Sequence, residues 1–432
     1  MGTKLSNAFK PNNLSVLLIV MSLLGIFFKS NISSITLIIL FVFSQINFFI
    51  IENKQLKDLK GIFNFKSYYV YFIGYFVLVL LSVLYSTDTS TALKYTIRHV
   101  AFIFLPISFF CLPKLSLENQ LKIRKVYVYW VAILFTFLLI NAIINNHLKG
   151  YSLIDFFQAR LENLFGLDHE KVFIEYWLFT YEGLTQIIDI QPIYLTLFVN
   201  VAFVFLLKLK ENNKLSNKLF WFFSFYYLLF VLLLSSRSGL GVFILLFIGY
   251  VNFIMPKTNK DRVKGVTITL LFLSIALGVI FTNPILKYRV MSVLNPSEEH
   301  KHLNFSNQSI RLIKWKNALE EIKEAPILGH GIGDYKNKLL QRYRINDFKV
   351  GLKHEYNAHN QYLDTMLQVG VLGLLVLVLL FFYGLNSPGF EIKFIFGIFL
   401  ISFITESMFG RHWGVVSFTL FSCFLRQNND RA

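Results

Sequence analysis

Long apolar runs recur through this chain and limit what it can fold into. Each run has about 17 to 20 mostly apolar residues, the length that crosses the hydrocarbon core of a bilayer as a helix. Helices suit lipid because they satisfy their own backbone hydrogen bonds. We predict an all-α polytopic membrane protein with about twelve transmembrane helices, at 13–29, 33–51, 67–86, 96–112, 125–144, 192–209, 218–235, 239–255, 265–282, 363–383, 391–406 and 411–426.

Composition excludes a soluble globular protein. Of 432 residues, 55% are hydrophobic and only 16% are charged. The formal net charge of +17 raises the question of nucleic-acid binding, but Lys and Arg cluster between apolar runs, where membrane topology explains them. We therefore expect membrane lipid, and no nucleic acid, as a partner. The two cysteines, Cys111 and Cys423, match no metal-ligand spacing.

Positive charge alternates from loop to loop and predicts the topology. Clusters of Lys and Arg lie on every second loop, within 54–66, 114–125, 208–218 and 257–264. The positive-inside rule places these loops and both termini in the cytoplasm. The predicted organisation is a bundle of nine spans over 1–282 with an outer loop at 145–191, a large periplasmic loop at 283–362, and three last spans within 363–432.

The large hydrophilic loop is predicted to hold two amphipathic helices. The first places its apolar residues at helical spacing: Leu312, Trp315, Leu319 and Ile322. Pro326 ends this pattern, and a second helix is expected from Asp334 as N-cap, with Leu339 and Tyr343 on one side. The glycines at 329–333 resemble a phosphate-binding loop, but such loops follow a strand, so we predict a flexible turn.

Two arginines on the outer side are candidates for binding an anion. Arg237 lies at the start of an inward-running helix, whose free N–H groups and positive dipole end suit a diphosphate. The alternative is an arginine that only extends to the interface. Arg311 shares a helical face with Trp315, Ala318 and Ile322, the face expected to pack on the membrane domain. Its charge needs a partner there, either a lipid phosphate or a buried carboxylate.

His359 is the candidate general base. It also begins an inward-running helix, and the helix N-terminus disfavours imidazolium, so a neutral imidazole that accepts a proton is expected. The alternative is a capping or interfacial histidine without chemistry. Arg98 and Glu406 lie at the outer ends of predicted spans. Charged groups at membrane depth are costly, so these two are expected to line a cavity as donor-site candidates.

Three motifs in order carry a family resemblance. They are Leu234-Ser235-Ser236-Arg237-Ser238-Gly239, then Arg311-x-x-x-Trp315 leading to Pro326-x-x-Gly329-x-Gly331-x-Gly333, and Ala358-His359-Asn360-x-Tyr362-Leu363 followed by Gly370-x-x-Gly373-Leu374. Together, over roughly residues 190 to 426, the chain resembles the O-antigen ligase and polymerase superfamily.

The resemblance implies a metal-independent, GT-C-like glycosyltransferase without a cofactor, at the periplasmic face of the bacterial inner membrane. Its donor would be a glycan on undecaprenyl diphosphate. Arg237 and Arg311 would hold the diphosphate, and His359 would deprotonate the acceptor hydroxyl; Asn360 and Tyr362 are further donor- or acceptor-site candidates. The acceptor would be a lipid A–core sugar for a ligase, or another polyprenol-linked glycan for a polymerase.

Other classes fit the sequence less well. A transporter or flippase would show repeated halves and broken helices at the midplane, and no halves match here. A metal-dependent lipid-sugar transferase would need an acidic metal pair in an outer loop, for which Asp168-His169-Glu170 is the candidate. Within the family, one large outer loop beside a smaller first one favours a ligase over a polymerase.

Overall fold

The computed structural model describes residues 11–65, 67–150, 178–255, 258–282 and 307–426. Within these residues all regular structure is helical, which confirms the predicted all-α class. The chain divides into two compact units, one formed by 1–120 and 307–432 and the other by 121–306. The predicted three-part division at 282 and 362 stays a prediction.

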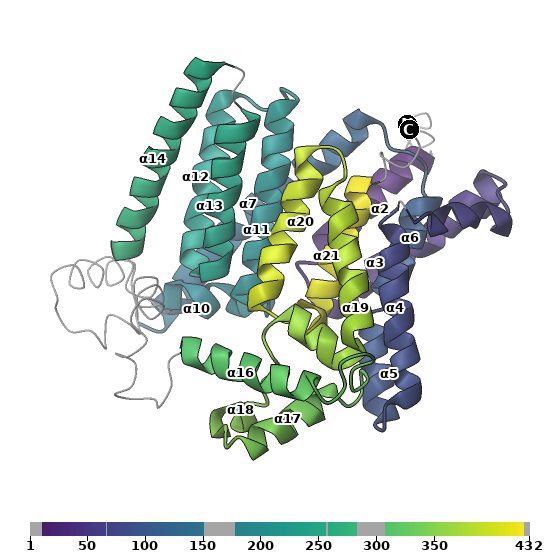
Figure 1. The fold of residues 1–432 in the computed structure, drawn as a ribbon. Coiled ribbons are helices and arrows are strands. Elements are labelled where there is room, and N and C mark those ends of the chain that lie inside the picture. The colour runs from purple at the N-terminus through teal and green to yellow at the C-terminus, as the bar shows by residue number, and fades with distance from the viewer. Residues whose placement is uncertain (1–10, 66, 151–177, 256–257, 283–306, 427–432) are drawn as a thin grey trace. The chain divides into compact units, whose positions relative to one another are not determined.

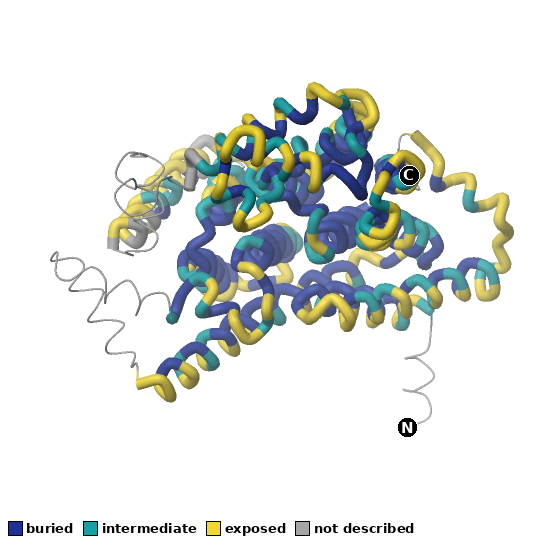
Figure 2. Tube along the Cα trace, turned by 90° about the horizontal axis from the view of Figure 1, so that it is seen from below, coloured by how far each residue is buried: buried dark blue, intermediate teal, exposed yellow. Residues whose placement is uncertain are grey.

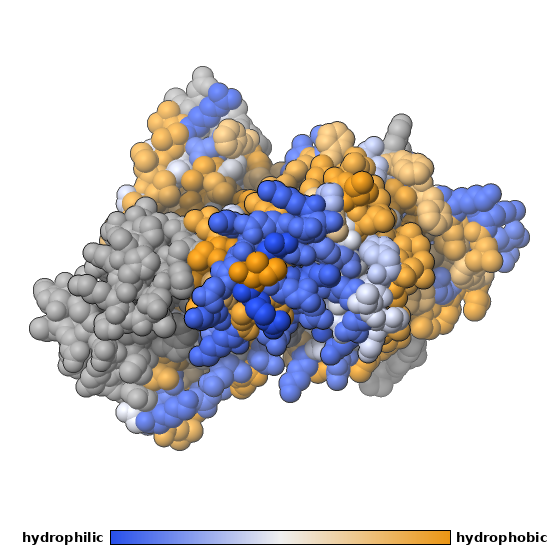
Figure 3. Space-filling view, turned by 60° about the horizontal axis from the view of Figure 1, so that its bottom comes forward, coloured by the Kyte–Doolittle hydropathy of each residue, from blue (hydrophilic) through white to orange (hydrophobic). Residues whose placement is uncertain are grey.

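Unit 1 is built from helices of both ends of the chain. In order these are α2 (Pro11–Gly25), α3 (Ser30–Ile46), η1 (Asn47–Ile51), η2 (Leu56–Phe63), α4 (Tyr69–Ser82), η3 (Val83–Tyr85), α5 (Thr89–Arg98), α6 (Ala101–Cys111), α16 (Asn307–Ile322), α17 (Tyr335–Ile345), α18 (Lys349–Lys353), α19 (Gln361–Leu385), α20 (Phe390–Thr405), η7 (Met408–Gly410) and α21 (His412–Arg426). Helices α4, α6, α19, α20 and α21 pack side by side, and α16 to α18 lie together at one end of this bundle (Figure 1). Hydrophilic side chains gather over these three helices (Figure 3).

Aromatic side chains fill the centre of unit 1. The rings of Phe102 and Phe409 meet edge to face with centroids 4.9 Å apart, and Phe403 and Phe418 lie around Phe409. Such ring pairs add to the burial of apolar area. The sequence is rich in Phe, and this cluster shows where part of that content is used.

Unit 2 is organised around one buried helix. Its elements are most of α7 (Leu117–Leu148), which begins in unit 1, followed by α10 (Tyr181–Thr185), η4 (Gln186–Ile188), α11 (Pro192–Glu211), α12 (Asn217–Leu234), α13 (Arg237–Gly249), η5 (Tyr250–Ile254) and α14 (Asn259–Thr282). Helix α11 packs against α12 and α13, and nearly all its residues are buried. Figure 2 shows buried and exposed positions alternating along most other helices, as expected where one face packs and the other meets solvent or lipid.

Each predicted span coincides with a helix, but the number of crossings is not confirmed. Among the described residues, seven helices are long and apolar enough to cross a membrane: Ser30–Ile51, Thr89–Cys111, Leu117–Leu148, Pro192–Glu211, Asn217–Leu234, Arg237–Ile254 and Gln361–Leu385. The other predicted spans correspond to α2, α4 with η3, α14, α20 and α21. Twelve crossings, and a periplasmic position for the hydrophilic loop, therefore stay predictions.

Helix α19 is broken at Val369 and Gly370, and the glycine-rich loop forms backbone hydrogen bonds at the break. Val369 and Gly370 leave helical geometry, and Gly370 has φ +64°, a region that favours glycine. A Cβ atom at Gly370 would collide with the carbonyl of Ile327. Three backbone hydrogen bonds join the loop to the break: His330 N to Leu367 O (2.8 Å), Gly331 N to Gln368 O (3.0 Å) and Val371 N to Pro326 O (2.9 Å). The loop thus satisfies backbone groups that the break would leave unpaired.

The amides of the glycine-rich residues 329–333 all donate within the chain, so none of these is left for a phosphate. The next two amides donate to serine hydroxyls, Ile332 N to Ser82 Oγ at 3.2 Å and Gly333 N to Ser86 Oγ at 3.1 Å. A phosphate-binding loop points such amides at its ligand. The glycines therefore serve close packing, which agrees with the predicted turn.

The two predicted amphipathic helices are present, with two differences. Helix α17 starts after Asp334 and buries Leu339 and Tyr343, as expected, but the Asp334 side chain does not cap it. In α16, Ala318 and Ile322 are buried, whereas Leu312 and Leu319 are the exposed ones. The inner face of α16 also holds polar residues, namely Lys314, Asn317 and Glu321. The packed face thus includes Ile322 of the predicted apolar stripe but not Leu312 or Leu319.

Candidate functional site

His359 lies in the loop just ahead of α19. Asn360 is the N-cap: its Oδ1 accepts hydrogen bonds from the amides of Tyr362 (3.0 Å) and Leu363 (3.2 Å). His359 therefore stands one residue outside the helix, with φ +47°, an uncommon conformation for a non-glycine residue. Such backbone positions occur often at functional sites. The alternative that His359 itself caps the helix is wrong, because Asn360 does so.

A carboxylate lies beside the His359 ring. The Nδ1 atom of His359 is 3.2 Å from Oε2 of Glu406, and the two side chains are 29% and 15% exposed. If Nδ1 carries its proton toward this carboxylate, Nε2 is left as the acceptor. Nε2 forms no hydrogen bond with any residue that the structure describes. This arrangement of base and orienting carboxylate suits general-base chemistry.

Hydrogen bonds fix the position of Glu406 and of the loop that carries it. It follows the last residue of α20 in extended backbone, and its Oε1 accepts a hydrogen bond from the Ser407 amide at 3.2 Å. The Ser407 hydroxyl accepts one from the Asn360 amide at 3.2 Å, which ties the Glu406 loop to the start of α19. Burial raises the pKa of Glu406, but the hydrogen bond and charge of His359, the Ser407 amide and the charge of Arg311 together outweigh it, so the net pKa is lowered.

Two cations of α16 act on this pair. The charge of Arg311, which is half-buried, contributes to lowering the pKa of Glu406. One turn further on, Lys314 is buried, with its Nζ 3.6 Å from the centre of the Tyr356 ring. The structure thus brings together Arg311, His359 and Glu406 as predicted candidates. Lys314 was not among the predicted candidates, because in the sequence a lysine among several on an amphipathic helix is indistinguishable from a solvated one.

Three other candidates, Arg98, Tyr362 and Asn360, form polar contacts within the protein. Arg98 donates from Nη1 to the Gly410 carbonyl at 3.2 Å and stacks over Tyr95 at 4.7 Å. The Tyr362 hydroxyl donates to the Leu400 carbonyl at 2.9 Å. Asn360 uses its side-chain oxygen for the cap. Their roles toward donor or acceptor stay predictions.

Arg237 belongs to unit 2. Helix α13 begins at Arg237 itself, with Ser236 as N-cap accepting from the Gly239 amide at 3.4 Å. Gly239 packs tightly on Thr196, and Asn200 donates to the Gly239 carbonyl at 3.1 Å. The sequence thus builds a close contact of α11 with the first turn of α13. That Arg237 joins Arg311 at one site stays a prediction.

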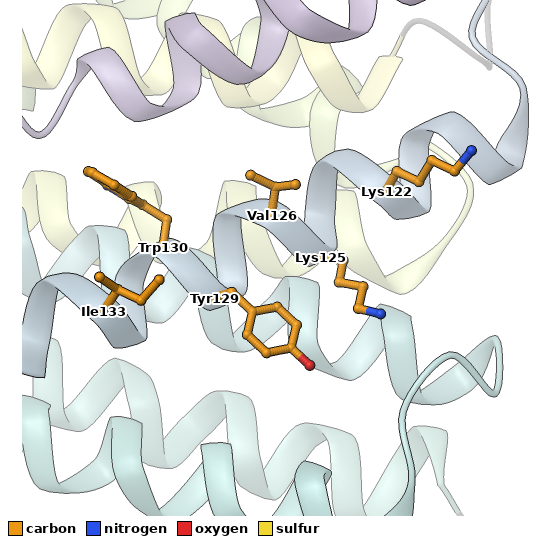
Figure 4. A pocket seen from close by; sticks show the side chains of 6 residues that line it. All are labelled: Lys122, Lys125, Val126, Tyr129, Trp130 and Ile133. Carbon is orange, nitrogen blue, oxygen red and sulfur yellow. The ribbon is translucent and has the colours of Figure 1, made fainter. Parts of the chain in front are cut away.

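Two pockets are lined by described residues of unit 2. One, of about 360 Å³, runs along α7 with lysines toward one end and Trp130 and Ile133 toward the other (Figure 4). The second, of about 480 Å³, has a more polar lining at the start of α11: Lys149, Leu178, Glu182, Gly183, Thr185, Gln186, Asp189, Ile190, Gln191 and Pro192. The polar side chains among these residues can form hydrogen bonds with sugar hydroxyls.

The described residues contain no group of three His, Cys, Asp or Glu side chains placed to hold a metal ion. The predicted candidate for a metal-dependent transferase, Asp168-His169-Glu170, lies outside the described residues.

One segment of the chain matches a known protein family. Residues 222–378 match the family described as O-Antigen ligase. Over this segment the chain is similar to the O-antigen ligase superfamily. The matched segment contains Arg237, Arg311 and His359, whereas Glu406 lies beyond it. The predicted resemblance is confirmed.

One curated relative matches part of the chain. An uncharacterized protein of Haemophilus influenzae is 29% identical over 144 residues, which are 30% of this chain and 36% of that protein. The chain thus matches about a third of the length of this relative. Activity, substrates and partners are argued below as proposals.

Proposed function

We propose that this protein, which matches the O-antigen ligase family over residues 222–378, is a metal-independent membrane glycosyltransferase. It transfers a glycan from undecaprenyl diphosphate to a sugar hydroxyl of lipid A–core at the periplasmic face of the bacterial inner membrane. The observation that carries the proposal is the His359–Glu406 pair beside Arg311, within and next to the segment that matches the family.

In the proposed step, Nε2 of His359 accepts the proton of the acceptor hydroxyl. The acceptor oxygen forms a bond to the anomeric carbon of the donor glycan, while the bond from that carbon to the phosphate oxygen breaks. Undecaprenyl diphosphate leaves with the bonding electron pair. Glu406 orients the imidazole through Nδ1 and stabilises the imidazolium that forms.

Arg311 and Arg237 are proposed to bind the diphosphate. Guanidinium groups donate two parallel hydrogen bonds to phosphate oxygens and remain charged at all relevant pH values. Charge grows on the diphosphate as it leaves, so fixed cations stabilise the transition state more than the ground state. No divalent cation is required in this mechanism.

The test uses purified protein, an undecaprenyl-diphosphate glycan and lipid A–core, with products separated by size. Glycan on lipid A–core supports the ligase. A ladder of longer polyprenol-linked glycans would instead support a polymerase, which shares the donor chemistry but takes another lipid-linked glycan as acceptor. Intact lipids with net movement of donor across a vesicle membrane would support a transporter or flippase and contradict the proposal.

Arg311→Lys gives a second check on the donor site. It keeps the charge but loses the planar fork, so the KM for the donor should rise about tenfold, equivalent to one lost charge-assisted hydrogen bond. Exposed Arg344 on α17 offers the matched control, Arg344→Lys, which should behave as wild type. An unchanged KM in Arg311→Lys would remove Arg311 from the donor site.

A further inference from the structure

Lys314 has a buried amine that forms no ion pair with any described residue. Its side chain is only 4% exposed, although it belongs to the hydrophilic helix α16. Its Nζ forms no hydrogen bond and no ion pair with any residue that the structure describes; its close contact is the face of the Tyr356 ring, 3.6 Å away. Removing an ammonium group from water is costly, and a ring face replaces little of that hydration.

No carboxylate among the described residues forms an ion pair with Lys314. The charged or titratable ones are Arg311 on α16, Tyr356 and His359 ahead of α19, Asp364 on α19, and Glu406 after α20. The carboxylates of this region already have partners: Glu406 with His359, Asp364 with the Ala358 amide, and Glu321 with Arg342 from α17. Lys314 is thus placed to receive an anion from outside the chain.

The position of Lys314 suggests which anion. It lies three residues after Arg311, so both side chains project from the same side of α16. Tyr356, which carries the ammonium on its face, is also in ring contact with His359 at 5.8 Å. An anion held by Arg311 and Lys314 would therefore sit beside the proposed base.

We propose that Lys314 is a further ligand of the donor diphosphate, and that it takes up a proton when the donor binds. This inference rests on the proposed function. Burial, together with the charge of Arg311, lowers the pKa of Lys314 to about 7, against a smaller opposing effect of Glu406. At pH above 8 the amine is then largely neutral in the free protein. Diphosphate oxygens would stabilise the ammonium and raise its pKa, so binding draws in a proton.

A neutral resting state has a physical advantage at this site. Two cations one turn apart repel each other when no anion separates them. Losing the proton removes that repulsion, and the donor restores the charge only when it arrives. The site thus becomes fully cationic in the complex, where cations assist the departure of the diphosphate.

The experiment is calorimetric titration of the detergent-solubilised protein with undecaprenyl-diphosphate-linked N-acetylglucosamine, in buffers that differ in heat of ionisation. This probe is esterified at both ends of its diphosphate, so it does not itself bind protons between pH 6 and pH 9. For the wild type we expect uptake that approaches one proton per site at pH 8.5 and falls toward zero at pH 5.5.

Variants make the result specific to Lys314. Lys314→Met should bind about tenfold more weakly at pH 6, as expected for one lost charge-assisted hydrogen bond, and take up no proton. Lys314→Arg, which stays charged, should bind without uptake. Lys316→Met, exposed on the same helix, is the control and should match the wild type. Thermal unfolding confirms that each variant is folded.

The outcomes separate this inference from the proposed function. Equal affinity and equal proton uptake in the wild type and Lys314→Met would overturn the role of Lys314 and leave the proposed function standing. Binding of the probe by the wild type without any proton uptake would do the same. No binding of the probe by the wild type would overturn both, because the proposed donor would then be wrong.

Discussion

The Nδ1 atom of His359 lies 3.2 Å from Oε2 of Glu406, although 47 residues separate them in the chain. Glu406 ends a helix and His359 precedes one, so the pair joins two loops at one end of unit 1. Ser407, bonded to the Asn360 amide, fixes the spacing of these loops. The imidazole is therefore oriented by the fold before any substrate binds.

Glu406→Gln should lower the transfer rate by about 10 to 10², the usual cost of removing an orienting partner. The pKa of Glu406 is below its ordinary value of about 4.3, so the carboxylate is ionised throughout pH 6 to 9. The loss should therefore be similar across that range. A rate equal to wild type, measured with saturating donor, would show that Glu406 does not assist His359.

Asp334→Asn should destabilise unit 1. Its carboxylate accepts hydrogen bonds from the Thr87 amide (2.6 Å), the Thr87 hydroxyl (2.9 Å) and the Asp88 amide (3.0 Å). Weakening these hydrogen bonds should lower the free energy of unfolding by about 1 to 3 kcal/mol at pH 7, which would be measured as a lower Tm. Asp347→Asn, in an exposed loop position, is the control.

The Asp334 effect should depend on pH. Burial raises the pKa of Asp334, but the hydrogen bonds from Thr87 and Asp88 outweigh it and lower the net pKa. The unfolded chain has an Asp pKa of about 3.9, so the stabilisation is complete above that pH and is lost as pH falls through the lower folded-state pKa. The Tm difference between wild type and Asp334→Asn should shrink below pH 4; a constant difference would contradict this.

Gly370→Ala should impair folding. The residue has φ +64°, and the added methyl group would meet the Ile327 carbonyl, so a cost of about 1 to 3 kcal/mol or more is expected. Gly397→Ala on α20 is the control, since open space surrounds that position. The measurement is Tm in detergent together with the yield of monodisperse protein. Equal values for both variants would show that the break in α19 tolerates a side chain.

Chelation of divalent cations should leave the transfer rate unchanged, because the proposed mechanism stabilises the leaving diphosphate with side-chain cations. The assay compares rates with and without EDTA. A loss of activity that Mn²⁺ or Mg²⁺ restores would contradict metal independence and direct attention to Asp168-His169-Glu170.

The sequence predicted the helices well because their signal is local. Apolar runs of membrane-spanning length end at polar residues, and each coincides with a helix in the structure. The break at Val369 and Gly370 was not predicted, because it depends on hydrogen bonds from a loop some forty residues earlier. The polar inner face of α16 was missed for a similar reason: Lys314 and Glu321 are buried by partners on other elements.

The candidate site was predicted residue by residue, but not as an arrangement. Arg311 stood out as a charge on the face of an amphipathic helix expected to pack on the membrane domain, and His359 and Glu406 stood out at the ends of predicted spans. Nothing in the spacing indicated that Glu406 would reach His359, since that contact requires two loops to be tied by Ser407 and Asn360. From the sequence, the helix N-terminus was expected to keep His359 neutral. In the structure, the Glu406 carboxylate lies beside its ring.

The most direct test of the central claim is the transfer rate of His359→Ala in the reconstituted assay, with His147→Gln, an exposed position of α7, as control. Loss of a positioned general base should lower the rate by about 10² to 10⁴, while binding of the donor lipid is retained. A His359→Ala variant that transfers glycan at nearly the wild-type rate would contradict the role of His359 as the base.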